Sequence, residues 1–154
     1  MSLYFVRHAK AGDRLMWDGE DRDRPLSKKG RRQAERLAER FADIPVPRVL
    51  SSPFARCIQT VEPLARSKGL AVHPIDILAE GSVFLDVLEL LESVPDHTVL
   101  CSHGDVIPET MSALVRRGLE LDGPEDWRKG VTWVIERTGN EFTRATVWEP
   151  PASE

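Results

Sequence analysis

The chain has 154 residues, the size of one ordinary domain, and is long enough to bury a core without disulfides or structural metals. Hydrophobic residues make up 41% and charged residues 30% of the chain, the profile of a soluble globular protein, and no apolar run has the length of a membrane span. The net charge of −4 argues against a nucleic-acid partner, so any positive charge that serves an anionic substrate must be gathered locally.

The two cysteines, Cys57 and Cys101, are too few for a disulfide framework and lie within apolar patterns. This usage is typical of reduced, buried cysteines in a cytoplasmic protein. The short apolar start at residues 1–6 is followed at once by an arginine and does not resemble a signal peptide. We therefore expect a soluble cytoplasmic protein with no membrane partner.

The apolar run at residues 3–6 predicts a first strand, and the polar segment 13–24 after it predicts an unusually long loop. Ser27 has the character of a helix N-cap. The helix that follows is expected to bury one face, made of Ala34, Leu37, Ala38, Phe41 and Ala42.

Residues 48–50 predict a second, short strand, after which Ser52 is expected to cap a helix with Pro53 at its first position. The buried stripe expected for this helix is Cys57, Ile58, Val61, Leu64 and Ala65. Residues 70–75 predict a third strand. The helix expected next would bury Phe84, Val87, Leu88 and Leu91.

Residues 98–101 predict a fourth strand, and a helix is expected to start near Asp105 with Pro108 in its first turn. Residues 132–135 and 142–147 are expected to form a closing hairpin. Strands that alternate with amphipathic helices indicate an α/β fold with a mainly parallel sheet. We expect one three-layer α/β/α domain over residues 1–154, with no internal repeat and no linker.

Three of the predicted strands end in residues that can do chemistry. The first runs into Arg7 and His8, the second into Ser52 with Arg56 one turn later, and the fourth into His103. Ligands of an open parallel sheet bind outside the carboxyl ends of its strands. If these strands are parallel neighbours, two imidazoles and two guanidinium groups converge on one cationic pocket.

Each member of this set also has a purely structural interpretation. His8 or His103 taken alone can be a strand-end residue bonded to a loop, and Arg7 can pair with a loop carboxylate. Arg56 is harder to explain in this way, because it stands in the first turn of a helix, where the dipole disfavours a cation and attracts an anion. The combination favours a binding site for an anionic group.

The same segments resemble the motifs of the histidine phosphatase superfamily. Residues 5–9, Phe-Val-Arg-His-Ala, are similar to its Arg-His-Gly signature, with alanine where glycine is usual. The other similar segments are 26–34 (the start of the first helix), 51–60 (the second arginine motif), 78–80 (the region that often supplies an acid) and 102–104, Ser-His-Gly (the second histidine motif). The matches run in family order from residue 3 to about residue 105.

The resemblance implies a phosphoglycerate mutase-like fold and a phosphatase of the small SixA-type branch, which acts on phosphohistidine. A second likeness, in residues 21–26, 56–64 and 106–108, is to the phosphatase-like domain that follows a Nudix domain in some actinobacterial fusions. It adds nucleotides and other small phosphate esters to the expected substrates. The partner is thus a phosphorylated small molecule or a phosphohistidine protein.

Neutral imidazole is a good nucleophile near pH 7, so we expect His8 to attack phosphorus and form a transient phosphohistidine. Arg7 and Arg56 offer planar donor forks for phosphoryl oxygens, and a protonated His103 adds a further donor. With these cations we expect no metal ion and no cofactor. The histidines also lack metal-ligand spacing.

Further residues are also expected at the site. The resemblance implies Glu80 as the acid that protonates the leaving group, with a solvated loop carboxylate as the alternative. Ser52 and Gly104 are expected to contact the phosphate. For Ser52 the first role expected is that of helix cap, and the phosphate contact is the second. The loop 13–24 either covers the pocket, where Arg14 or Arg22 would meet further negative charge on the substrate, or is simply solvated.

Two other functions remain open on the sequence. One is a phosphate-binding or regulatory module without turnover. The presence of all four pocket residues, the two histidines and two arginines, argues against this function. The other is a mutase that retains the phosphoryl group. The short chain argues against this function, because it leaves little material for an enclosed site that excludes water. His73 and His97 lie outside the convergent set and are expected to be structural or surface residues.

Overall fold

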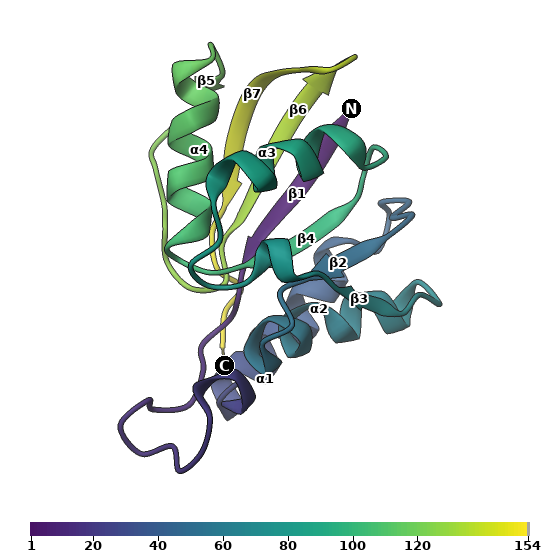
Figure 1. Cartoon of the computed structure of the whole chain (residues 1–154). Helices are drawn as coiled ribbons and strands as arrows, with labels where there is room; N and C mark the ends of the chain where they lie inside the picture. Colours follow the sequence, from purple (N-terminus) through teal and green to yellow (C-terminus); the bar gives the residue numbers. More distant parts are fainter. Residues whose placement is uncertain (154) are drawn as a thin grey trace.

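The computed structural model describes residues 1–153, which form a mixed sheet with helices on both faces (Figure 1). The elements in chain order are β1 (Ser2–Arg7), η1 (a 3-10 helix, Asp21–Asp23), α1 (Lys28–Arg40), β2 (Val49–Ser51), α2 (Ala55–Ser67), β3 (Val72–Pro74), η2 (Asp76–Leu78), α3 (Phe84–Ser93), β4 (Val99–Ser102), α4 (Val106–Arg116), β5 (Glu120–Leu121), β6 (Thr132–Thr138) and β7 (Glu141–Trp148).

The strand order in the sheet is β3-β2-β4-β1-β6-β7-β5. The first four of these strands are parallel to one another. Strand β6 is antiparallel to both of its neighbours, β1 and β7, and β5 pairs in parallel with β7. The mainly parallel α/β sheet with its closing hairpin confirms the fold class expected from the sequence. Strand β5, only two residues long, was not foreseen.

The central strand β1 is buried on both faces. Leu3 and Phe5 pack into the core beneath α3 and α4, whereas Tyr4 and Val6 pack into the core beneath α1 and α2. Successive side chains of a strand point to opposite faces, so a strand covered on both sides reads as a continuous apolar run. The arrangement has the three layers that the sequence predicts (Figure 1).

Helix α1 begins where the sequence indicates, because the Ser27 hydroxyl accepts a hydrogen bond from the Gly30 amide at 3.1 Å. A Cβ on Gly30 would lie 1.9 Å from the carbonyl oxygen of Lys10. Glycine at this position therefore lets α1 pack directly against the segment that follows His8.

Other local predictions are wrong. Ser52 does not cap α2, which begins at Ala55 after the N-cap residue Phe54. The Ser52 hydroxyl instead accepts from the Phe54 amide in a tight turn and lies beside His103, so it is not available to the helix. Ala42 is exposed because α1 has already ended at Arg40, and Ile58 is only half-buried.

Both cysteines are fully buried and free, as expected from their apolar surroundings. Among residues 1–153, no helix combines the length and the apolar composition that crossing a membrane requires.

Candidate active site

Strands β1, β4 and β2 are adjacent and parallel, so their carboxyl ends meet at one edge of the sheet. A cavity of about 230 Å³ opens there. Its lining residues are Arg7, His8, Arg14, Arg24, Arg56, Glu80, His103, Gly104, Asp105 and Lys129. The structure thus brings together the residues singled out by the sequence for this site except Ser52, which is fully buried, and Arg22.

His8 directly follows β1 and is 5% exposed. Its Nδ1 lies 2.8 Å from the carbonyl oxygen of Ala9. Burial lowers the pKa of His8 to about 3, and the positive charges of His103, Arg56 and Arg7 act in the same direction. The ring is therefore neutral near pH 7. Because a carbonyl can only accept, Nδ1 carries the proton and Nε2 keeps its lone pair.

The backbone around His8 is fixed by its neighbours. The Thr60 hydroxyl on α2 accepts from the Ala9 amide at 2.9 Å and donates to the Arg56 carbonyl at 2.7 Å. The His8 amide donates to Ser102 on β4 at 3.1 Å. These bonds lock the position of the imidazole relative to β4 and α2.

Arg7 lies between two loops. Its Nη1 donates to the carbonyl oxygen of Trp127, and its guanidinium lies against the backbone of Gly104. Its Nε is buried and has no hydrogen-bond partner among the described residues. A buried N–H donor without a partner is costly, so this atom is poised to receive an acceptor from outside the protein.

Arg56 is 1% exposed and stands in the first turn of α2. Its Nη1 donates to the Asp21 carbonyl at 3.0 Å, and its Nη2 contacts Asp21 Oδ2 at 3.1 Å and Glu80 Oε2 at 2.9 Å. Its Cζ lies 5.0 Å from the centre of the Phe54 ring. As with Arg7, its Nε is buried and unpartnered within residues 1–153.

His103 follows β4 and is 2% exposed. Its Nε2 lies 2.8 Å from the Ser52 hydroxyl and 3.5 Å from the Cys57 sulfur. The edge-on Phe54 ring, 4.8 Å away between centroids, packs against it. The His103 and His8 rings are 5.5 Å apart, so both imidazoles face the same small volume. Ser52 does not line the cavity, so it acts on the site through its contact with His103.

Four residues of the site were missed by the sequence analysis: Asp21, Arg24, Asp105 and Lys129. Asp21 pairs with Arg56, Arg24 and Arg14, and Arg24 is 5% exposed and donates to Asp21 Oδ1 at 2.9 Å. Desolvation raises the pKa of Asp21, but the hydrogen bond from Arg24 and the nearby arginine charges outweigh it and lower the pKa. Lys129 lies just before β6, which runs antiparallel to β1. The hairpin was foreseen, but its pairing with β1, which places Lys129 at the site, was not.

The loop 13–24 reaches the cavity through Arg14 and Arg24. Arg22 is not among the lining residues; its Cζ lies 5.8 Å from the centre of the Phe54 ring. His73 is exposed on β3 and His97 lies in a turn with a positive φ of 69°, so both are outside the cavity, as expected. Within residues 1–153, no cluster of three or more His, Cys, Asp or Glu side chains has an arrangement that could hold a metal ion.

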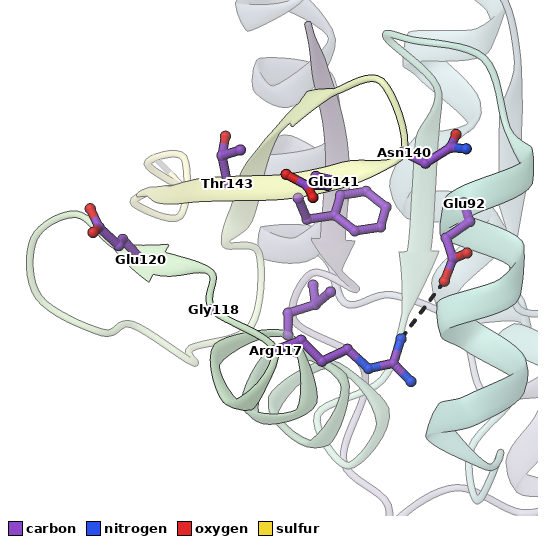
Figure 2. Close-up of a pocket in the computed structure, with 9 residues that line it drawn as sticks. Glu92, Arg117, Gly118, Glu120, Asn140, Glu141 and Thr143 are labelled. Atoms are coloured by element: carbon purple, nitrogen blue, oxygen red, sulfur yellow. Dashed lines mark ion pairs between the residues drawn. The ribbon is translucent and has the colours of Figure 1, made fainter.

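A larger hollow of about 380 Å³ lies at the opposite end of the sheet, beside the turn of the β6–β7 hairpin (Figure 2). Arg117 and Glu92 form an ion pair across it at 3.8 Å, and Phe142 forms part of its wall. Glu120 points away from this pair in Figure 2. This hollow has no histidine and only one arginine in its lining, so it lacks the groups that the edge of the sheet gathers.

Residues 3–83 match the model of the histidine phosphatase superfamily (branch 1). The 8-oxo-(d)GTP phosphatase of Mycolicibacterium smegmatis is 33% identical over 157 aligned positions, which cover 97% of this chain and 48% of that protein. The chain therefore spans about half the length of this relative.

Two solved structures show the same fold. The protein histidine phosphatase SixA complexed with tungstate has a TM-score of 0.77 at 18% identity, over 99% of this chain and 97% of that one. The proposed phosphohistidine phosphatase SixA from Nakamurella multipartitia has a TM-score of 0.70 at 26% identity, over 98% and 96% of the two chains.

Proposed function

The chain belongs to the histidine phosphatase superfamily, which supports a phosphatase activity, and we propose that it hydrolyses phosphate compounds through a covalent phosphohistidine formed on His8. The substrate is a phosphohistidine protein or a phosphorylated small molecule. The reaction uses the cations of the site in place of a metal ion. We further propose that residues 1–154 act as a single domain.

One observation carries this proposal: the neutral imidazole of His8 lines the cavity together with Arg7 and Arg56, and its contact with the Ala9 carbonyl leaves the lone pair on Nε2. The Ala9 carbonyl selects the tautomer of His8, and burial keeps the ring unprotonated. A protonated histidine in this place could not attack phosphorus. These two features support the assignment of His8 as the nucleophile.

The arginines supply the second requirement, a fixed grip on the phosphoryl group. Arg7 and Arg56 both line this cavity, and the Nε donor of each is buried and has no partner among residues 1–153. We assign them to phosphoryl oxygens, where they would neutralise the charge of a dianion and hold phosphorus in line with His8. The SixA relative was solved with tungstate, a tetrahedral oxyanion of similar shape, which is consistent with this assignment.

The reaction then takes two steps. In the first, the lone pair of His8 Nε2 forms a bond to phosphorus as the bond to the leaving oxygen breaks, and the electron pair stays on that oxygen, which takes a proton unless it is already stable as an anion. Glu80, bonded to Arg56 at 2.9 Å, is the candidate donor of this proton. In the second, water attacks phosphorus, and the N–P electron pair returns to Nε2 as inorganic phosphate leaves.

His103 contributes a hydrogen bond to the phosphoryl group in both steps. Its ring is held by Ser52, whose hydroxyl can donate or accept and so remains bonded in either protonation state of the imidazole. Gly104 serves the site through its lack of a side chain, because Arg7 occupies that space.

The test is hydrolysis of p-nitrophenyl phosphate in EDTA, together with rapid acid-free quenching and mass spectrometry of the peptide that contains His8. We expect turnover in EDTA and a phosphoryl group on this peptide. His8→Ala should abolish both. The matched control is His73→Ala, which removes an exposed histidine outside the cavity and should retain the activity.

Two results would contradict the proposal. Inactivity of the wild-type protein against a panel of phosphoesters and phosphohistidine protein would favour a phosphate-binding module without turnover. Transfer of labelled phosphate back to another position of the substrate, rather than to water, would favour a mutase.

A further inference from the structure

Lys129 is a cation in the lining of the active-site cavity that forms no ion pair with a carboxylate of the described residues. It lines the cavity together with four arginines, and it makes no ion pair with any residue from 1 to 153. Its own burial lowers its pKa, and the charges of Arg7, Arg24, Arg14 and Arg56 lower it further. A lysine held among like charges is unfavourable unless an anion joins them.

The position of Lys129 is fixed by the backbone on both sides. The next residue, Gly130, donates its amide to the carbonyls of Arg7 at 3.2 Å and His8 at 3.0 Å. On the other side, the Trp127 carbonyl accepts from the Arg7 guanidinium. Lys129 is thus tied to the two residues that lie at the centre of the proposed phosphoryl site.

The cavity holds more positive charge than the carboxylates around it balance. Four arginines and Lys129 face Glu80 and Asp105 in the lining, and Asp21 offsets one further charge of the arginines, which leaves an excess of two positive charges. Asp21, just outside the lining set, is already shared by Arg14, Arg24 and Arg56. Arg14 contacts it only at 3.6 Å and its side chain is 65% exposed, which leaves Arg14 free to turn toward a ligand.

We propose that Lys129 and Arg14 bind a second anionic group of the substrate, next to the phosphoryl group that His8 attacks. The preferred substrates are then compounds with two neighbouring oxyanions, above all phosphoanhydrides such as nucleoside diphosphates and triphosphates, and not simple monoesters. This inference rests on the proposed function, because it assigns the substrate class of the same site.

A phosphoanhydride also suits the chemistry of the site. When His8 attacks its terminal phosphorus, the bond to the bridging oxygen breaks and the electron pair remains on that oxygen, which becomes a terminal oxygen of the departing phosphate. The negative charge develops on the leaving-group side of the cavity. A lysine fixed there stabilises the transition state without any proton transfer.

The experiment compares kcat/KM of Lys129→Met with that of Lys29→Met, an exposed lysine on α1 outside the cavity. The substrates are p-nitrophenyl phosphate, with no second oxyanion, ADP, with a second phosphate, and 2-phosphoglycolate, with a carboxylate. We expect the ratio of ADP to p-nitrophenyl phosphate activity to fall about tenfold or more in Lys129→Met, the loss of one charge-assisted contact, and to stay constant in Lys29→Met. A parallel fall for 2-phosphoglycolate would identify a carboxylate as an equally good second group.

Binding separates a failure of this inference from a failure of the proposed function. In a His8→Ala background, pyrophosphate should bind more tightly than orthophosphate by calorimetry, and adding Lys129→Met should remove the difference. Equal affinity of the two anions, or an equal loss of activity on all three substrates in Lys129→Met, would overturn the second anion site. A wild-type protein that hydrolyses none of the three substrates but still prefers pyrophosphate to orthophosphate would instead overturn the proposed function alone.

Discussion

The guanidinium group of Arg7 occupies the space where residue 104 would carry a side chain. A Cβ built on Gly104 would lie 2.5 Å from Cζ, 2.6 Å from Nη2 and 2.8 Å from Nε of Arg7. No carbon atom can approach these atoms so closely. The end of β1 and the end of β4 are thus fitted to each other, and the glycine after His103 is needed for the arginine before His8.

Gly104→Ala should therefore displace Arg7 from the cavity. We expect kcat/KM for p-nitrophenyl phosphate to fall about 100-fold, the effect of losing one fixed donor to the transition state, while circular dichroism shows a folded protein. Gly12→Ala is the matched control, because the nearest contact of its new methyl group is Pro25 O at an ordinary 3.7 Å. A wild-type rate for Gly104→Ala would show that Arg7 is dispensable for binding phosphate.

Thr60 offers a test of how the backbone after His8 is held. Thr60→Val keeps the shape of the side chain but removes the acceptor of the Ala9 amide. We expect kcat to fall and the free energy of unfolding to drop by about 1 kcal/mol. In the matched control Thr110→Val, the lost hydroxyl is equally buried but bonds only to the Val106 carbonyl of its own helix. Equal losses of kcat in the two variants would rule out a positioning role for Thr60.

Much of the fold could be predicted from the sequence because its strongest signals are local. The apolar run of β1, the Ser27 cap of α1 and the spacing of apolar residues in α3 each follow from the residues of that element alone. Strand β5 was missed because two residues carry no periodicity. Ser52 was misassigned because a serine before a proline reads as a cap, whereas here its hydroxyl is engaged by a turn and by His103.

The candidate site could be predicted only in part, for a related reason. Arg7 ends a parallel strand, His8 and His103 directly follow parallel strands, and Arg56 stands in the first turn of the next helix. A general rule brings residues at such positions to one edge of the sheet. Lys129 reaches the same edge because β6 pairs antiparallel with β1, which no local pattern reveals. Asp21 and Arg24 reach it through the folding of a long loop, which the sequence shows to be polar but does not place.

The neutral state of His8 can be observed directly. Its pKa of about 3 means that the NMR resonance of its ring Cε1 proton should not shift between about pH 5 and pH 8, a range in which an ordinary histidine titrates. Absence of the signal from His8→Ala assigns it. A midpoint near 6.5 would show that His8 is not desolvated in the way that the structure indicates.

The same pKa links His8 to stability. Because the unfolded state binds a proton at His8 more tightly than the folded state does, the free energy of unfolding should fall as the pH drops from about 6.5 towards 3. Urea unfolding of His8→Asn should show a shallower loss over this range than the wild type. An identical slope in both proteins would contradict the link.

Arg56 should not be replaceable by lysine. An ammonium group has three donors, too few for the Asp21 carbonyl, Asp21 Oδ2, Glu80 and a phosphoryl oxygen, all of which the guanidinium fork can serve. We expect Arg56→Lys to lower kcat/KM about 100-fold, nearly as much as Arg56→Ala, with the fold retained. Arg66→Lys, on the exposed side of the same helix, should behave as the wild type, since its pairing with Glu62 is a surface contact. Near-normal activity of Arg56→Lys would show that only the charge matters.

The role of Glu80 can be separated from its contact with Arg56 by varying the leaving group. Glu80→Gln keeps an oxygen that accepts from Arg56 but removes a group that can donate a proton from a carboxylic acid. An alkyl phosphate needs that proton, whereas p-nitrophenolate leaves without it. We expect the activity ratio of glycerol 2-phosphate to p-nitrophenyl phosphate to fall about 100-fold.

Asp21→Asn is the matched control, because it alters the other carboxylate on the same arginine and also keeps an acceptor oxygen. If Glu80 acts only by positioning Arg56, both variants should lose activity to a similar extent on both substrates, since the grip on the phosphoryl group does not depend on the leaving group. A loss that grows with the basicity of the leaving group in Glu80→Gln alone would place the proton donor at residue 80.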